Sequence, residues 1–139
     1  MKEDKLKVLF DSNIIIDILT KRTGSDDSLA CFYKMAEQEI EGYLSSKQIT
    51  DIHYVLRKYL PKDKRMAALN KIISLFNVVD LTCLEIEHAM FFAGEDFEDN
   101  VLVASAYNNG IYKILTKDKG KFLHHVVEAI QPSELLEII

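Results

Sequence analysis

The sequence predicts a three-layer α/β/α sandwich with a central, mostly parallel sheet, formed by a single domain that spans residues 1–139. Short apolar runs alternate along the chain with longer segments whose apolar residues recur at helical spacing. Strands separated by helices are joined by right-handed crossovers, and the resulting parallel sheet is covered on both faces. With 139 residues, 48% of them hydrophobic, the chain has the size of one domain with one sizeable core.

The first predicted element is the apolar run Leu6–Phe10, which ends at Asp11-Ser12-Asn13, as expected of a buried strand that opens into a loop. Amphipathic spacing then predicts helices over Ile14–Leu19, Ser28–Ile40, Gln48–Tyr59, Asp63–Phe76, Ile86–Ala93 and Val101–Tyr107. Gly42 and Pro61 are expected to end the second and third of these helices. Further strands are predicted at Val78–Val79, Ile111–Leu115 and Val126–Val127, and Pro132 opens a terminal helix.

Composition limits the classes of partner. The chain has 22 acidic and 17 basic residues, so its formal charge is −5 and it is not a polycation that coats nucleic acid nonspecifically. We expect no signal peptide, because the first residues are polar, and no membrane contact, because the apolar runs are too short to span a membrane. Cys31 and Cys83 lack metal-ligand spacing and are expected to be buried thiols in a reducing, cytoplasmic setting.

Four aspartates are placed where a parallel sheet gathers its ligands. Asp11 follows the first strand and Asp118 lies just past the strand Ile111–Leu115, so neighbouring strands would bring these two acids together. Asp51 and Asp99 are expected in the first turns of two helices that face the same crevice. Converging carboxylates repel one another unless a cation neutralises them, and an all-oxygen site suits Mg²⁺ or Mn²⁺. Such a site can activate a water for attack on a phosphodiester.

The segment GEDFEDN supplies one of these acids and raises a separate question, because it crowds four carboxylates in front of an apolar helix. Asp96 is the expected N-cap of that helix, and it is also a candidate to contact a metal through water. Asp99 is the candidate metal ligand. Glu95 and Glu98 are expected to be solvated charges that favour the helix start through the macrodipole.

Four segments, VLFDSNIIIDIL, SSKQITDIHYVLRK, DFEDNVLVASAYNNGIYKILTKD and QPSELL, together resemble the PIN-domain family in content and order. The resemblance spans nearly the whole chain. Known PIN domains are metal-dependent ribonucleases on a parallel α/β/α sandwich, and many small bacterial ones are VapC-type toxins of toxin–antitoxin pairs. The resemblance therefore implies a cytoplasmic endoribonuclease that acts on RNA, a small antitoxin partner that lies across the acidic crevice, and a homodimer.

Carried over by position, the four family acids correspond to Asp11, Asp51, Asp99 and Asp118, and polar supporting positions to Asn13 and Thr116. Two departures bear on the number of metal ions. The second acid is usually glutamate, so the shorter Asp51 is expected to reach a metal through water. The usual Asp-Phe pair after the fourth acid is here Lys121-Phe122.

Three lysines flank Asp118. Lys117, Lys119 and Lys121 are candidates to hold substrate phosphates near the metals, against the alternative of a solvated turn.

Two other functions fit parts of the sequence. A PIN-like module that binds RNA or protein without useful catalysis would agree with the shorter Asp51 and the acidic net charge. VLFDSN also resembles the aspartate loop of haloacid-dehalogenase-like phosphatases, in which the residue two after the nucleophile is an acid that transfers a proton. Asn13 occupies that position here and cannot transfer a proton, which disfavours the phosphatase.

Overall fold

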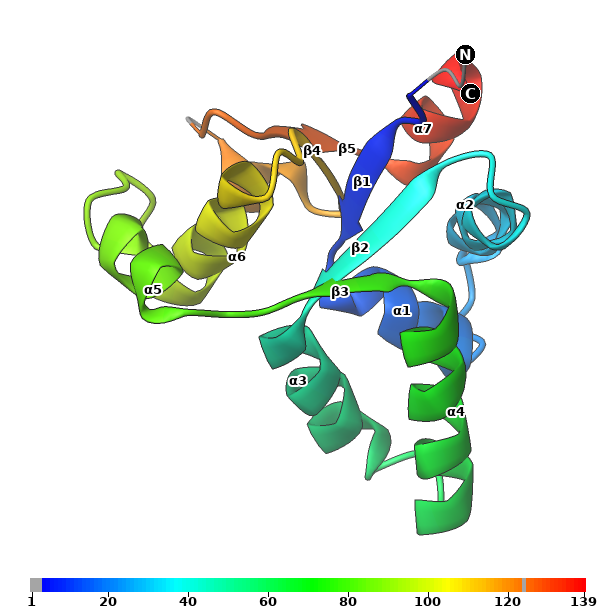
Figure 1. The fold of residues 1–139 in the computed structure, drawn as a ribbon. Helices are drawn as coiled ribbons and strands as arrows, with labels where there is room; N and C mark the ends of the chain where they lie inside the picture. Colours follow the sequence, from blue (N-terminus) through cyan, green and yellow to red (C-terminus); the bar gives the residue numbers. More distant parts are fainter. Residues whose placement is uncertain (1–3, 124) are drawn as a thin grey trace.

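The computed structural model describes residues 4–123 and 125–139, and these form a five-stranded sheet between two layers of helices (Figure 1). All strand pairs are parallel, and the strand order is β3-β2-β1-β4-β5. This arrangement confirms the predicted α/β/α fold. The strands are β1 (Lys7–Phe10), β2 (Glu41–Ser45), β3 (Asn77–Val79), β4 (Lys113–Leu115) and β5 (Glu128–Ile130).

The helices divide between the two faces of the sheet (Figure 1). They are α1 (Ser12–Leu19), α2 (Asp26–Ala36), α3 (Ser46–Leu56), α4 (Lys62–Leu75), α5 (Cys83–Ala89), α6 (Phe97–Asn108) and α7 (Pro132–Ile138), with a 3-10 turn η1 (Lys119–Phe122). Helices α5 and α6 cover one face, and α1 to α4 with α7 cover the other. Within the described part of the chain, every helix is too short or too polar to cross a membrane.

The central strand β1 shows why the sheet needs both layers. Successive side chains of a strand point to opposite faces, and Val8 and Phe10 accordingly pack in the core under α1 to α4, whereas Leu9 packs in the core under α6. All three side chains are fully buried. A shift of β1 by one residue would exchange the two sets, so burial on both faces strongly specifies the register.

Strand β2 was not predicted, and the error began at Gly42. The glycine was expected to end a helix that extends to Ile40, but α2 ends at Ala36 and Gly42 lies inside β2, paired with Val8. The side chains of Met35 and Phe76 pack so closely over Gly42 that a Cβ atom would collide with them. The segment EGYLS has no apolar run like those of the other strands. Its second position is a glycine because a larger residue would not fit under Met35 and Phe76.

Two smaller expectations were also wrong. The last strand, β5, covers Glu128–Ile130 rather than Val126–Val127, because the backbone that pairs with β4 begins at Glu128. Cys31 is buried as expected, but Cys83 is exposed at the start of α5. The predicted terminal helix, strand Val78–Val79 and helix after the acidic cluster all have counterparts in the structure.

The strand order places a crevice between β1 and β4. From β1 the chain passes through α1 and α2 on one face to reach β2, whereas it reaches β4 through α5 and α6 on the other face. The connections therefore diverge at the carboxyl ends of β1 and β4, which is where open parallel sheets bind their ligands. Because α6 runs back against the strand direction, its N-terminus reaches the same edge of the sheet.

Candidate active site

Asp11 lies at the carboxyl end of β1, and two neighbours from the β4 side hold its carboxylate. The backbone N–H of Asp11 donates to the carbonyl of Leu115 at 2.8 Å, which extends the pairing of the two strands by one residue. The hydroxyl of Thr116 donates to Asp11 Oδ2 at 2.9 Å, and the ammonium of Lys121 contacts the same oxygen at 3.2 Å. Asp11 is 6% exposed and Thr116 is fully buried, so this geometry is fixed by the core.

Asp99 comes to the crevice from the first turn of α6. Asp96 is the N-cap of this helix, as predicted, because its Oδ1 accepts the backbone N–H of Asp99 at 3.0 Å. Capping thus uses the amide of Asp99 and leaves its carboxylate available. Asn100, which is buried, anchors the loop in front of the helix by donating to the carbonyl of Gly94 at 2.9 Å.

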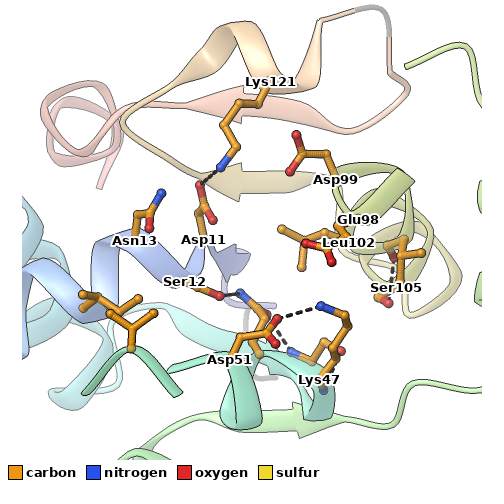
Figure 2. A pocket seen from close by; sticks show the side chains of 15 residues that line it. Asp11, Ser12, Asn13, Lys47, Asp51, Glu98, Asp99, Leu102, Ser105 and Lys121 are labelled. Atoms are coloured by element: carbon orange, nitrogen blue, oxygen red, sulfur yellow. Dashed lines mark hydrogen bonds and ion pairs between the residues drawn. The ribbon is translucent and has the colours of Figure 1, made fainter. Parts of the chain in front are cut away.

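The carboxylates of Asp11 and Asp99 and the ammonium of Lys121 gather on one side of a cleft with a volume of about 250 Å³ (Figure 2). Burial raises the pKa of Asp99, Lys121 lowers it, and Asp96, Asp11 and Asp118 raise it again, so that the pKa is above its usual value. Burial lowers the pKa of Lys121, but the ion pair with Asp11 and the nearby Asp99 and Asp118 outweigh this effect and raise it. Three acids, Asp11, Asp96 and Asp118, therefore act on Asp99 together with one lysine.

Asp51 lines the same cleft but lies on another wall, beside Lys47 (Figure 2). It was expected in the first turn of its helix. That placement was wrong, because α3 begins at Ser46 and Asp51 is therefore in the second turn. Its side chain is 48% exposed, and Lys47 Nζ contacts its Oδ2 at 2.7 Å, an i,i+4 pair along the helix. The ion pair turns the Asp51 carboxylate toward its own helix.

Asp118 and Asn13 lie at the margins of the site. Asp118 is exposed, and its backbone N–H donates to the Thr116 hydroxyl at 3.1 Å. Asp118 acts on the pKa of Asp99 and of Lys121, but it does not line the cleft. Asn13 lines the cleft from the first turn of α1, next to Asp11 (Figure 2).

The three lysines near Asp118 differ in their partners. Lys121 points into the cleft, whereas Lys117 Nζ contacts the buried Asp17 at 2.7 Å and Lys119 Nζ contacts Glu134 at 3.1 Å. Both of these acids lie outside the cleft lining. The expected contact of Lys117 and Lys119 with substrate phosphates stays a prediction, and it would require these ion pairs to open.

Gln48 is the supporting residue that was missed from the sequence. Its side-chain N–H group donates to the carbonyl of Phe10 at 2.7 Å and to the hydroxyl of Ser12 at 3.2 Å, and its carbonyl accepts the backbone N–H of Ser45 at 2.8 Å. Gln48 thereby ties the end of β1 to the start of α3. The sequence carried a signal for it, because Ser45 and Gln48 form a capping box, S-x-x-Q, three residues before the predicted helix start.

The donor groups suit a hard divalent ion held by few protein ligands. Among residues 4–123 and 125–139, no three Asp, Glu, His or Cys side chains lie close enough together to form a ready-made metal site, so the four predicted acids do not converge as one cage. Asp11 and Asp99 nevertheless offer two carboxylates to one cleft, in surroundings where burial, and after it the neighbouring acids, disfavour ionisation of Asp99. Mg²⁺ commonly keeps several waters and binds through one or two carboxylates.

Topology and site together define a doubly wound α/β protein with an acidic cleft at its switch point. The sequence pattern of the PIN domain matches residues 7–120, which is most of the chain. The protein therefore belongs to the PIN-domain family, a family of nucleases. No curated protein matches the chain.

Solved structures agree with this fold. The chain is similar to FitAcB from Neisseria gonorrhoeae (TM-score 0.71, 16% identity, 91% of this chain and 98% of that one). It is also similar to a toxin–antitoxin complex from Klebsiella pneumoniae (TM-score 0.68, 19% identity, 90% and 97%). A third similar structure is the sarcin-ricin loop cleaving toxin VapC20 of Mycobacterium tuberculosis (TM-score 0.57, 13% identity, 77% and 86%). At these identities the likeness concerns the fold.

Proposed function

We propose that the protein is a metal-dependent endoribonuclease that hydrolyses phosphodiester bonds of RNA. The observation that carries the proposal is the presence of the Asp11 and Asp99 carboxylates in one cleft at the switch point of a PIN-domain sheet. Membership of a nuclease family supports hydrolysis of nucleic acid. Similarity in fold to a toxin that cleaves the sarcin-ricin loop favours RNA as the substrate.

In this proposal Asp11 and Asp99 would hold a Mg²⁺ or Mn²⁺ ion, and the chemistry that such an ion would supply is activation of a water and stabilisation of negative charge on the phosphate. Thr116 orients the Asp11 carboxylate, and Asn13 supports it from the start of α1. Lys121 is placed to donate a hydrogen bond to a substrate phosphate that enters the cleft.

The remaining predicted residues act at the border of this site. Three acids are proposed to contact the metal through water rather than directly: Asp51, Asp118 and the N-cap residue Asp96. Lys117 and Lys119 are proposed to approach substrate phosphates outside the cleft.

The Asp99→Asn variant tests the function. Purified wild-type protein should cleave RNA with Mg²⁺ or Mn²⁺, and Asp99→Asn should abolish cleavage, because an amide is a poor ligand for these ions. Glu95→Gln is the matched control: it removes one negative charge four residues away, at an exposed position outside the cleft, and it should retain cleavage. Equal cleavage by wild type and Asp99→Asn would indicate a contaminating nuclease and reject the proposal.

Thermal unfolding of Asp99→Asn distinguishes a loss of catalytic activity from a loss of folded protein. The pKa of Asp99 is raised in the folded protein, so its contribution to stability is present at acid pH and is lost as the pH rises through that pKa. At neutral pH the ionised carboxylate therefore opposes folding. Asp99→Asn should unfold at or above the temperature of the wild type at pH 7, with the difference shrinking at acid pH.

A second candidate is a PIN-like module that binds RNA or protein with little catalysis. The ion pair between Lys121 and Asp11 favours it, because the lysine occupies one carboxylate that a metal would need. Millimolar Mn²⁺ should raise the unfolding temperature of a metal-dependent enzyme, because a ligand that binds only the folded state stabilises it. RNA binding without any shift in Mn²⁺ would favour the module.

We further propose that the protein is the toxin of a toxin–antitoxin pair, with a small antitoxin as partner and a homodimer as its own assembly. The similar structure from Klebsiella pneumoniae, a toxin–antitoxin complex, supports a partner of this kind. Co-expression with the product of the adjacent open reading frame should yield a complex with reduced RNA cleavage. A monomer that neither co-purifies with that product nor is inhibited by it would contradict this assignment.

A further inference from the structure

The fold around Lys121 fixes the position of this lysine beside the acids of the cleft. It lies in η1, and its neighbour Phe122 is buried in the core with Leu9 and Ile114. The backbone N–H of Lys121 donates to the carbonyl of Asp118 at 3.3 Å, which closes the turn. Its side chain is 26% exposed, so the ammonium is partly withdrawn from water. The turn therefore delivers a positive charge into the cleft as a fixed part of the structure.

The ammonium of Lys121 serves more than one carboxylate. It contacts Asp11 Oδ2 at 3.2 Å, and it is the cation that lowers the pKa of Asp99. Asp118 lies close enough to act on the same ammonium. Lys121 is thus a shared counter-charge for the acids of the site, in contrast to Lys47, whose ion pair joins it to Asp51 on another wall.

Counting charge then indicates how many divalent ions the site needs. The cleft is lined by four acids, Asp11, Asp51, Glu98 and Asp99, and by two lysines, Lys47 and Lys121, so two negative charges stay unbalanced. One divalent ion neutralises this remainder, whereas a second would create an excess of positive charge beside the ammonium. The ammonium would repel a second ion bound beside it, and such repulsion is large in a partly buried site.

We propose that Lys121 is a built-in counter-cation that takes the place of a second divalent ion and limits the site to one. The inference rests on the proposed metal-dependent function and deepens it by assigning the ion count. It differs from a role restricted to holding substrate phosphate, because it predicts an effect of Lys121 on metal binding in the absence of RNA.

The experiment is a calorimetric titration of the full chain with Mn²⁺ alone, compared between wild type and variants. Wild type should bind one ion, Lys121→Met should bind Mn²⁺ at least about tenfold more tightly because a repelling charge is removed, and Lys121→Asp should bind two ions. Lys119→Met is the matched control: it removes the same charge two residues away, at an ion pair with Glu134 outside the cleft, and should change the affinity less than about twofold.

Lys121→Arg separates charge from packing, since it keeps the positive charge and should keep the weaker, one-ion binding of the wild type. Two ions bound by wild type, or equal affinity in Lys121→Met and Lys119→Met, would overturn the inference while leaving the proposed function intact. Absence of Mn²⁺ binding in every variant, with unfolding curves that show folded protein, would overturn the metal-dependent function and this inference with it.

Discussion

Replacing Thr116 by valine should destabilise the protein and misplace Asp11. The hydroxyl of Thr116 donates to Asp11 Oδ2 at 2.9 Å and accepts the backbone N–H of Asp118 at 3.1 Å, in a position without solvent exposure. Valine keeps the volume of the side chain and removes both hydrogen bonds. Water cannot replace the buried hydrogen bond to Asp11, whereas it can reach the amide of the exposed Asp118, so the bond to Asp11 accounts for most of the loss.

The magnitude follows from the two bonds. A hydrogen bond to a charged group contributes about 1.5–3 kcal/mol and a neutral one about 1 kcal/mol, so Thr116→Val should cost roughly 2–4 kcal/mol. An unfolding entropy of roughly 2.1 cal/mol/K per residue means that a chain of 139 residues loses about 3.4 °C in Tm for each kcal/mol. We expect a decrease in Tm of about 7–14 °C.

The assay is urea and thermal unfolding followed by circular dichroism, with Thr116→Ser as the control. Serine keeps the hydroxyl and loses one buried methyl group, which should cost about 1 kcal/mol. RNA cleavage should follow the same order, with valine more impaired than serine under conditions where both are folded. If the valine variant proves as stable as the serine variant, the hydroxyl does not hold the site together and the argument from these two bonds fails.

Two further substitutions test how the cleft is assembled. Gln48→Met removes the side-chain bonds that join the end of β1 to the start of α3, and it should lower the free energy of unfolding by about 2–3 kcal/mol, measured in urea. Gly94→Ala places a methyl group against Asn100, which anchors the loop before α6, and should cost about 1–3 kcal/mol by overpacking. Because the displaced loop carries the N-cap, that variant should also lose more cleavage activity than its fraction unfolded explains, whereas a proportional loss would limit the glycine to a folding role.

Several features of the fold follow from local patterns and could be predicted. Strands β1 and β4 are apolar runs flanked by polar residues, and α6 begins at an N-cap aspartate in front of an apolar segment. Strand β2 escaped prediction because EGYLS has no apolar run, and its glycine is explained only by Met35 and Phe76, which arrive from other elements. The start of α3 was missed although the capping box of Ser45 marked it locally.

The sequence alone indicated the family, the fold class and three of the acids that line the cleft, Asp11, Asp51 and Asp99, because motif, periodicity and strand ends are properties of neighbouring residues. Only the tertiary structure decided which distant charges meet: Lys121 with Asp11, and Lys117 with Asp17. Both pairs depend on how the β4–η1 segment packs against β1 and α1. For this reason the segment GEDFEDN could suggest Asp99 as a ligand, but the lysine that balances it became visible only in the folded chain.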